Sequence, residues 1–123
     1  MGYNSFEDLD VWKRACLLAV GVYESLRNCR DYGLKDQMTR SAVSIASNIA
    51  EGAERNSSAE YIRFLHIAKG SAAELRTQVY IAQQNGIYQN TQATDLIAEL
   101  KEISSMLQGL IKSITPNLKN KWS

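Results

Sequence analysis

The chain has 123 residues, 45% of them hydrophobic, and its formal net charge is only +1. This length fits one domain, which can bury roughly two-thirds of the surface that the unfolded chain exposes. The balanced charge argues against strong, general nucleic-acid binding, because such proteins concentrate positive charge to neutralise phosphates. No apolar run approaches the ~18 residues of a membrane span, so we expect no membrane insertion.

The N-terminal segment and the cysteines favour a cytoplasmic protein. Residues 1–14 carry three acidic residues before the first basic one, unlike the start of a secretory signal. Cys16 falls within a periodic apolar stripe, where a small buried thiol is ordinary. We therefore expect no disulfide between Cys16 and Cys29.

Apolar residues spaced by three and four predict a first helix at about 6–28, with Ser5 and Asp8 resembling a capping box at its start. We expect its core stripe to contain Leu9, Trp12, Cys16, Ala19, Tyr23 and Leu26.

The same spacing predicts a second helix at about 34–51, ended by Gly52 as a C-terminal stop. Its expected core residues are Met38, Ala42, Ile45 and Ile49.

The third predicted helix, at about 58–85, begins at a capping box of Ser57 and Glu60 and ends at Asn85-Gly86. Its expected stripe contains Tyr61, Leu65, Ala68, Ala72, Leu75, Val79 and Ala82.

A fourth helix is predicted at about 92–114, followed by Pro116, which we expect to end it, and by a short tail at 117–123. Its stripe contains Leu96, Leu100, Ile103, Leu107, Leu110 and Ile114. With short connections and no period-two alternation, residues 1–116 should form one all-α, antiparallel, up-down-up-down four-helix bundle.

Two helices carry more apolar residues than one core stripe requires. Helix 1 adds residues beside its stripe, and helix 3 adds isoleucines nearly opposite its own. A four-helix monomer offers each helix one core, so we expect the surplus to pack against another subunit. The candidate oligomer interface is Val11, Leu18, Val22, Ile67, Gly70, Glu74 and Ile81.

Catalytic, metal and cofactor motifs are missing from the sequence. His66 is the only histidine, whereas a di-iron bundle needs two Glu-x-x-His motifs. Cys16, Cys29 and His66 lack the paired spacing of a zinc site, and no phosphate-binding Gly-x-x-x-x-Gly-Lys occurs. We expect a protein that is not an enzyme and that holds neither cofactor nor metal.

Polar residues crowd two otherwise apolar helices, at residues 40–55 and 61–75. Ser44, Ser47 and Asn48 are poor interior helix formers, because their side chains compete for backbone groups. Their presence indicates either a binding surface or an internal polar network. The candidate partner or nucleic-acid surface is Arg40, Asn48, Glu51, Arg55, Arg63, Lys69 and Arg76.

These segments carry a family resemblance. LDVWKRA at 9–15, SNIAEG at 47–52 and FLHIAKGSAAEL at 64–75 resemble the four-helix-bundle family first found encoded in intervening sequences of bacterial 23S ribosomal RNA genes, sometimes labelled a ribosomal protein. The family commonly has proline where this chain has Ala46. More distantly, the chain is similar to the accessory variability determinants of diversity-generating retroelements, which are far more basic.

The resemblance implies a homo-oligomer, and a ring of five subunits is the arrangement associated with the family. Two functions remain open. The first is a non-enzymatic scaffold or interaction module that engages itself and a protein partner. The alternative is an RNA-associated protein, in which symmetry repeats a basic patch of Arg40, Arg55, Arg63, Lys69 and Arg76.

Overall fold

The computed structural model describes the backbone of residues 5–122 and the side chains of residues 5–116. Within that part of the chain, a short 3-10 helix and four α-helices occur and no strand. The all-α prediction is therefore confirmed. The elements are η1 (Phe6–Asp8), α1 (Asp10–Ser25), α2 (Tyr32–Ala53), α3 (Ser58–Gln84) and α4 (Asn90–Trp122).

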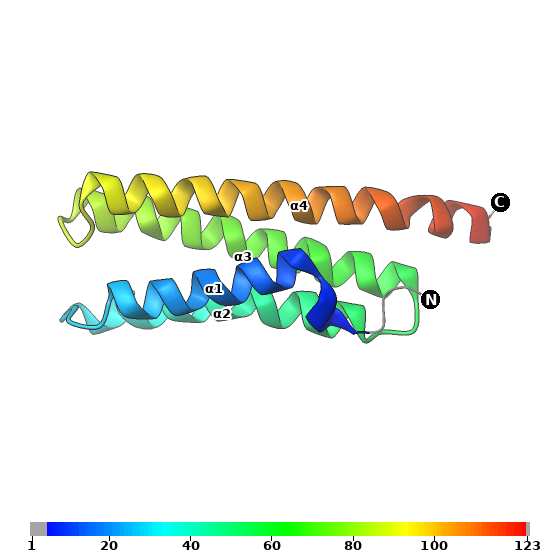
Figure 1. The fold of residues 1–123 in the computed structure, drawn as a ribbon, viewed down its shortest axis with the longest axis horizontal. Helices are drawn as coiled ribbons and strands as arrows, with labels where there is room; N and C mark the ends of the chain where they lie inside the picture. Colours follow the sequence, from blue (N-terminus) through cyan, green and yellow to red (C-terminus); the bar gives the residue numbers. More distant parts are fainter. Residues whose placement is uncertain (1–4, 123) are drawn as a thin grey trace.

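The four helices lie side by side around one core (Figure 1). α1 packs against α2 and α4, and α3 packs against the same two helices, whereas the diagonal pairs α1–α3 and α2–α4 make no close backbone contact in the described chain. The α1–α2 and α3–α4 connections lie at one end of the molecule and the α2–α3 connection at the other (Figure 1).

The predicted core stripes of the second and third helices are confirmed, and the fourth helix keeps the centre of its stripe. Met38, Ile45, Leu65, Leu75 and Leu107 are fully buried, because each lies on the single apolar face of its helix. Sequence reasoning missed Ile111, which is also buried.

On α1, the core extends beyond the predicted stripe to the residues beside it. Val11, Leu18 and Val22 are buried in the core of the single chain, together with Ala15. The prediction that these three residues meet another subunit was wrong, because side chains already enclosed within one chain are unavailable to a second. The expected stripe is confirmed only in part. Ala19 and Leu26 are buried in the core and Leu9, Trp12 and Cys16 pack partly buried against it, but half of the Tyr23 side chain is exposed.

Side-chain capping contacts explain the starts of α2, α3 and η1, but not that of α1. Ser57 Oγ accepts a hydrogen bond from the Glu60 backbone N–H at 3.1 Å, which confirms the cap of α3. Asp31 Oδ1 accepts from the Leu34 N–H, so α2 begins two residues before the predicted start. Ser5 caps only η1, and the extended backbone of Leu9 separates η1 from α1. The predicted capping box therefore belongs to a different, shorter helix.

The two glycines predicted to end helices behave differently. Gly86 follows the C-cap Asn85 with a φ of +77°, and its N–H and that of Ile87 bond back to the carbonyls of Gln83 and Ala82. This closing pattern needs a left-handed residue, which glycine supplies without a steric penalty.

Gly52 does not end α2, so that prediction was wrong. It lies inside the helix, and an added Cβ would come within 2.7 Å of Phe64 Cβ and 3.2 Å of the Tyr61 carbonyl oxygen. Its lack of a side chain lets α2 and α3 approach closely.

Pro116 does not end the fourth helix either, because α4 continues to Trp122 and projects beyond the other helices (Figure 1). A proline removes its own N–H bond and strains the preceding turn, but the following residues can still form their helical bonds. The predicted tail at 117–122 is therefore helical in its backbone, and Ser123 lies outside the described residues.

Candidate interaction surface

A groove of about 440 Å³ runs along the outer surface between α1 and α2. Its α1 wall carries Trp12 and Cys16 near the start of the helix and Val20 and Tyr23 farther along. Its lining is mostly apolar and contains no charged residue, and Ser47 and Tyr23 contribute hydroxyl groups. The complete lining is Trp12, Cys16, Ala19, Val20, Tyr23, Val43, Ala46, Ser47 and Ala50.

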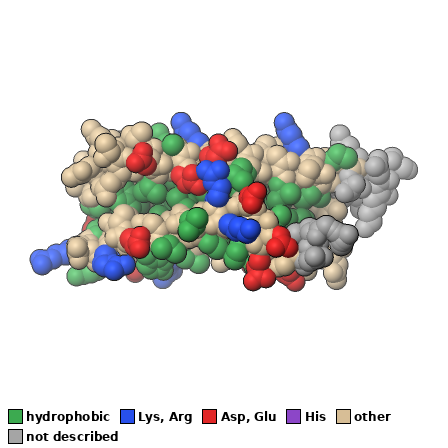
Figure 2. Space-filling view, in the orientation of Figure 1, with side chains coloured by type: hydrophobic (Ala, Val, Ile, Leu, Met, Phe, Trp, Pro, Cys, Tyr) green, Lys and Arg blue, Asp and Glu red, His purple; other side chains and the backbone are tan. Residues whose placement is uncertain are grey.

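Large apolar side chains at this surface are left in contact with water. Val20 is 55% exposed, Tyr23 50% and Val43 42%, and the neighbouring Leu17 on α1 is 72% exposed. Figure 2 shows hydrophobic atoms at the surface in the band where α1 and α2 run. Isolated exposed apolar residues are ordinary, but a contiguous set lining a groove is typical of a binding surface.

The two ends of the groove differ in charge. A second hollow continues from it at the end where α1 begins, where Phe6 lies beside Glu51 and Glu54. Figure 2 shows acidic side chains gathered toward that end and basic side chains at the opposite tip. Arg27 and Arg30 are exposed near that tip, in the α1–α2 connection. The groove therefore has an acidic end, whereas exposed basic and acidic side chains, Arg27 and Arg30 with Glu24 and Asp31, are mixed at the other end.

Cys16 places a thiol in the wall of this groove. Partial burial raises the pKa of the Cys16 thiol, because the surrounding apolar atoms disfavour the charged thiolate. Both Cys16 and Cys29 are free thiols, so the expectation of no disulfide agrees with the structure.

The polar residues of α2 have an internal role. Ser44 Oγ and Ser71 Oγ share a hydrogen bond of 2.9 Å between α2 and α3, and Asn48 Nδ2 donates to the carbonyl and hydroxyl of Ser44. Ser44 and Asn48 thus belong to a structural network. Ser47, between them in sequence, faces the α1–α2 groove instead.

Two of the candidate cations are engaged by neighbouring side chains. Arg55 pairs with Glu51 at 3.5 Å, Arg63 pairs with Glu60 at 3.3 Å, and both guanidinium carbons lie 4.7 Å from the centre of the Phe64 ring. The pairing reduces the positive field that these arginines could offer to phosphate.

The other predicted surface residues are dispersed. Arg40 lines a separate shallow hollow of about 250 Å³ with Glu74, between α2 and α3. Lys69 Nζ donates to Gln108 Oε1 on α4 at 2.5 Å, and Arg76 is half-buried on α3. The structure therefore does not gather the five predicted basic residues into one patch.

The outer face of α3 exposes the four α3 residues of the predicted oligomer interface. Ile67 is 40% exposed and Ile81 45%, and Gly70 and Glu74 are exposed between them. No atom outside the local helix lies within 4 Å of the position that a Gly70 Cβ would take, so this face is open. Its role in subunit contact stays a prediction.

Acidic residues of α4 have a role that sequence reasoning missed. Arg14 on α1 donates two hydrogen bonds to the Glu99 carboxylate, at 2.9 and 2.6 Å, and lies 4.0 Å from Glu102. The carboxylate beside it raises the pKa of the Arg14 guanidinium. The spacing of Glu99 and Glu102 on one helix side was the available signal, but it did not reveal the partner.

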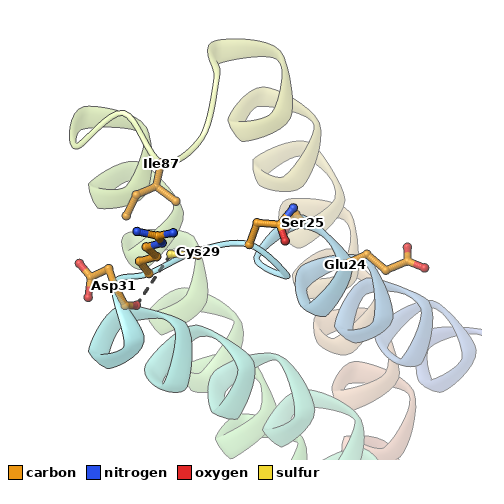
Figure 3. A pocket seen from close by; sticks show the side chains of 7 residues that line it. Glu24, Ser25, Cys29, Asp31 and Ile87 are labelled. Atoms are coloured by element: carbon orange, nitrogen blue, oxygen red, sulfur yellow. Dashed lines mark hydrogen bonds between the residues drawn. The ribbon is translucent and has the colours of Figure 1, made fainter.

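A small hollow of about 340 Å³ lies at the end of the bundle, between the α1–α2 connection and Ile87 (Figure 3). The Cys29 thiol there donates to the Asp31 carbonyl oxygen, and the Glu24 carboxylate points away from it. Among the described residues, no three side chains of His, Cys, Asp or Glu are grouped to hold a metal ion. Within the same part of the chain, no helix is long and apolar enough to cross a bilayer.

A family model described as 23S rRNA-intervening sequence protein matches residues 7–109, which include α1, α2 and α3 in full and much of α4. The chain belongs to this family. A solved structure from Bacteroides thetaiotaomicron, described as a protein with unknown function from the S23 ribosomal protein family, is 26% identical with a TM-score of 0.78. The match covers 83% of this chain and 98% of that one. No curated protein matches.

Two of the three segments that resemble the 23S rRNA-intervening sequence family contribute residues to the groove. Residues 9–15 open α1 and supply Trp12, and residues 47–52 supply Ser47 and Ala50 from α2. Ala46, where the family commonly has proline, lines the groove within an unbroken α2. In this family member, the wall of the groove is therefore a continuous helix.

Proposed function

We propose that this protein is a non-enzymatic interaction module, a subunit of a homo-oligomer of antiparallel four-helix bundles that associates through the α1–α2 groove. The observation that carries the proposal is the groove itself, with Val20, Tyr23 and Val43 each two-fifths or more exposed along an apolar hollow. Covering such side chains is favourable by about 25 cal/mol per Å² of apolar surface removed from water.

The composition of the groove supports association with protein. Its lining combines Trp12 and Tyr23 with small alanines, and aromatic residues in a partly enclosed apolar setting are typical of strong contact points in interfaces. A stable contact also needs about 1,000 Å² or more of buried surface, so residues flanking the groove, such as Leu17, would take part. A ring of five subunits, implied by the family resemblance, belongs to the same proposal.

The charges support this proposal over RNA binding. Arg55 and Arg63 lie beside Glu51 and Glu60, and the remaining candidate cations are scattered over separate faces. A phosphate-binding surface needs several Lys or Arg side chains on one face that are not already paired with carboxylates. An RNA function predicts salt-dependent binding of a ribosomal RNA fragment, whereas the interaction module predicts no binding at micromolar protein in physiological salt.

Sedimentation velocity of the purified chain tests the proposal. We expect an oligomer at micromolar concentration, and we expect Val20→Glu to shift it to monomer, because a carboxylate in the covered groove would lose its water. Ser105→Glu on the exposed surface of α4 adds the same charge away from the groove and is the matched control. A wild-type monomer, or a Val20→Glu variant as oligomeric as the control, would contradict the proposal.

A further inference from the structure

We propose that the α1–α2 groove is covered by the outer face of α3, with Ile67, Gly70 and Ile81, from a second copy lying in the same orientation. This inference rests on the proposed function, and it adds which surface fills the groove. Two different surfaces meet in such a contact, so each subunit offers a groove to one neighbour and an α3 face to another.

Most of the exposed aliphatic side chains belong to two separate surfaces. One is the α1–α2 groove with Val20, Tyr23 and Val43, and the other is the outer face of α3 with Ile67 and Ile81. α1 and α3 are diagonal in the bundle and make no close backbone contact. A contact between two grooves would leave the α3 isoleucines in water, whereas a contact between groove and α3 covers both surfaces.

The two surfaces also suit each other in shape. The groove is a hollow between two helices, while the outer face of α3 belongs to one helix. One turn from Ile67, Gly70 has no side chain and the space around it is open, while the exposed Glu74 lies midway between Ile67 and Ile81 and would keep its carboxylate at the edge of the contact. A helix with a small residue at its centre can bring its backbone close to a groove wall, with Ile67 beside it as an apolar anchor.

Charge selects the relative orientation of the two copies. α1 and α3 both begin at the end of the molecule where the α2–α3 connection lies (Figure 1). Near that end the groove has Glu54 and a Glu51 that pairs with Arg55, and α3 exposes Arg63, which pairs with Glu60 of its own helix. Glu54 is therefore the carboxylate that the Arg63 of a neighbouring copy can approach. Copies in the same orientation therefore bring Arg63 near the acidic end of the neighbouring groove.

The reverse orientation is disfavoured. It would separate Arg63 of one copy from Glu54 of its neighbour and move it to the opposite end of the groove, where Arg27 and Arg30 are exposed together with Glu24 and Asp31. Like charges placed together across a contact oppose association and reject the wrong register. A contact between different surfaces in one orientation can repeat from copy to copy, and it closes into a ring when the rotation per subunit divides a full turn.

A mixing experiment tests this pairing. Val20→Glu blocks the groove and Ile67→Glu blocks the α3 face, both at exposed positions where the fold tolerates charge. Each variant alone should be monomeric. An equimolar mixture should form a 1:1 heterodimer and nothing larger, because the intact groove of one variant fits the intact α3 face of the other. The double variant Val20→Glu/Ile67→Glu, with both surfaces blocked in the same chain, should stay monomeric at every concentration.

The outcomes separate this inference from the proposed function. If the wild type is a monomer, the proposed function itself fails. If the wild type is an oligomer that Val20→Glu dissociates but Ile67→Glu does not, the groove pairs with another surface and only the inference is overturned. An absence of heterodimer in the mixture, with both variants folded by circular dichroism, also overturns it.

A charge-reversal pair supplies a second measurement that does not depend on the isoleucine. Arg63→Glu should weaken subunit association by about fivefold, the effect of one exposed charge pair. Adding Glu54→Arg to the same chain should restore most of the loss, because each contact regains opposite charges. If the double variant associates no better than Arg63→Glu alone, the orientation proposed for the two copies is wrong.

Discussion

The two sides of α2 illustrate a complete contact and an incomplete one. Toward α3, Gly52 permits close approach to Phe64, and Ser44 and Ser71 share a hydrogen bond across the seam. Toward α1, the same helix presents Val43 and Ala46 to an open apolar groove. The α2–α3 seam is completed within one chain, whereas the α1–α2 seam has an apolar outer surface that a second molecule can cover.

The largest expected difference lies between two adjacent leucines of α1. Leu18 is buried in the core, so Leu18→Ala should lower the free energy of unfolding by about 2–5 kcal/mol by leaving a cavity. Leu17 is exposed, and Leu17→Ala should change it by less than about 0.5 kcal/mol.

Urea unfolding followed by circular dichroism measures both changes. The Val20→Glu background keeps subunit association out of the comparison, because association would make the apparent stability depend on concentration. Equal effects of the two substitutions would mean that the inner and outer faces of α1 have been confused.

A smaller effect is expected at the close approach of α2 and α3. Gly52→Ala should destabilise the chain by about 1–3 kcal/mol, because its Cβ would meet the backbone of α3 at Tyr61 as well as Phe64 Cβ. Gly109→Ala, in an open position inside α4, should instead stabilise it by about 0.5–1 kcal/mol. Thermal unfolding distinguishes the signs, and a stabilising Gly52→Ala would contradict the close approach.

The hydrogen bond between Ser44 and Ser71, which joins α2 and α3, should contribute less to the free energy of unfolding. Ser44→Ala should cost about 0.5–1.5 kcal/mol, the usual net value of one hydrogen bond. A double-mutant cycle with Ser71→Ala measures the coupling, and the double variant should lose less than the two single losses together. Strict additivity would show that the two hydroxyls do not interact in solution.

The smallest effect concerns alkaline pH at the end of the bundle. Burial raises the pKa of Tyr88, partly offset by its 2.6 Å hydrogen bond with Ser25. A folded-state pKa above the unfolded value gives stability that is present below about pH 10 and lost as the pH rises through the folded pKa. In the Tyr88→Phe variant, the free energy of unfolding from urea titrations should fall less as the pH rises above about 10. An unchanged pH dependence would contradict this prediction.

The sequence predicted the helices and most of the core because helices 2, 3 and 4 each have one dominant apolar stripe. α1 has two neighbouring stripes with the same spacing, and spacing alone does not rank them. The stripe with Trp12 and Tyr23 was expected to be the core, but the structure buries Ala15 and Val22 of the neighbouring stripe and leaves half of Tyr23 exposed. Helix periodicity defines a face, and only the neighbouring helices determine which face is covered.

The candidate surface was harder to predict for a related reason. The partners of Arg55 and Arg63 were readable from the sequence, because Glu51 and Glu60 lie four and three residues away at helical spacing. What the sequence did not reveal is that both guanidinium groups also lie over the Phe64 ring, so that they share one place on the surface. Gly52 and Gly86 likewise look alike as helix-ending glycines. One permits close helix contact and the other adopts a positive φ, and sequence spacing alone did not separate these roles.

Alkylation of Cys16 tests most directly whether the groove is the surface covered by association. Cys16 lies in the groove wall, and Cys29, at the end of the bundle, serves as an internal control. We predict that the Cys16 rate falls as protein concentration rises, with the same midpoint as oligomer formation in sedimentation, while the Cys29 rate stays constant. A Cys16 rate that is independent of concentration in a protein that forms oligomers would contradict the account, because association would then leave the groove open.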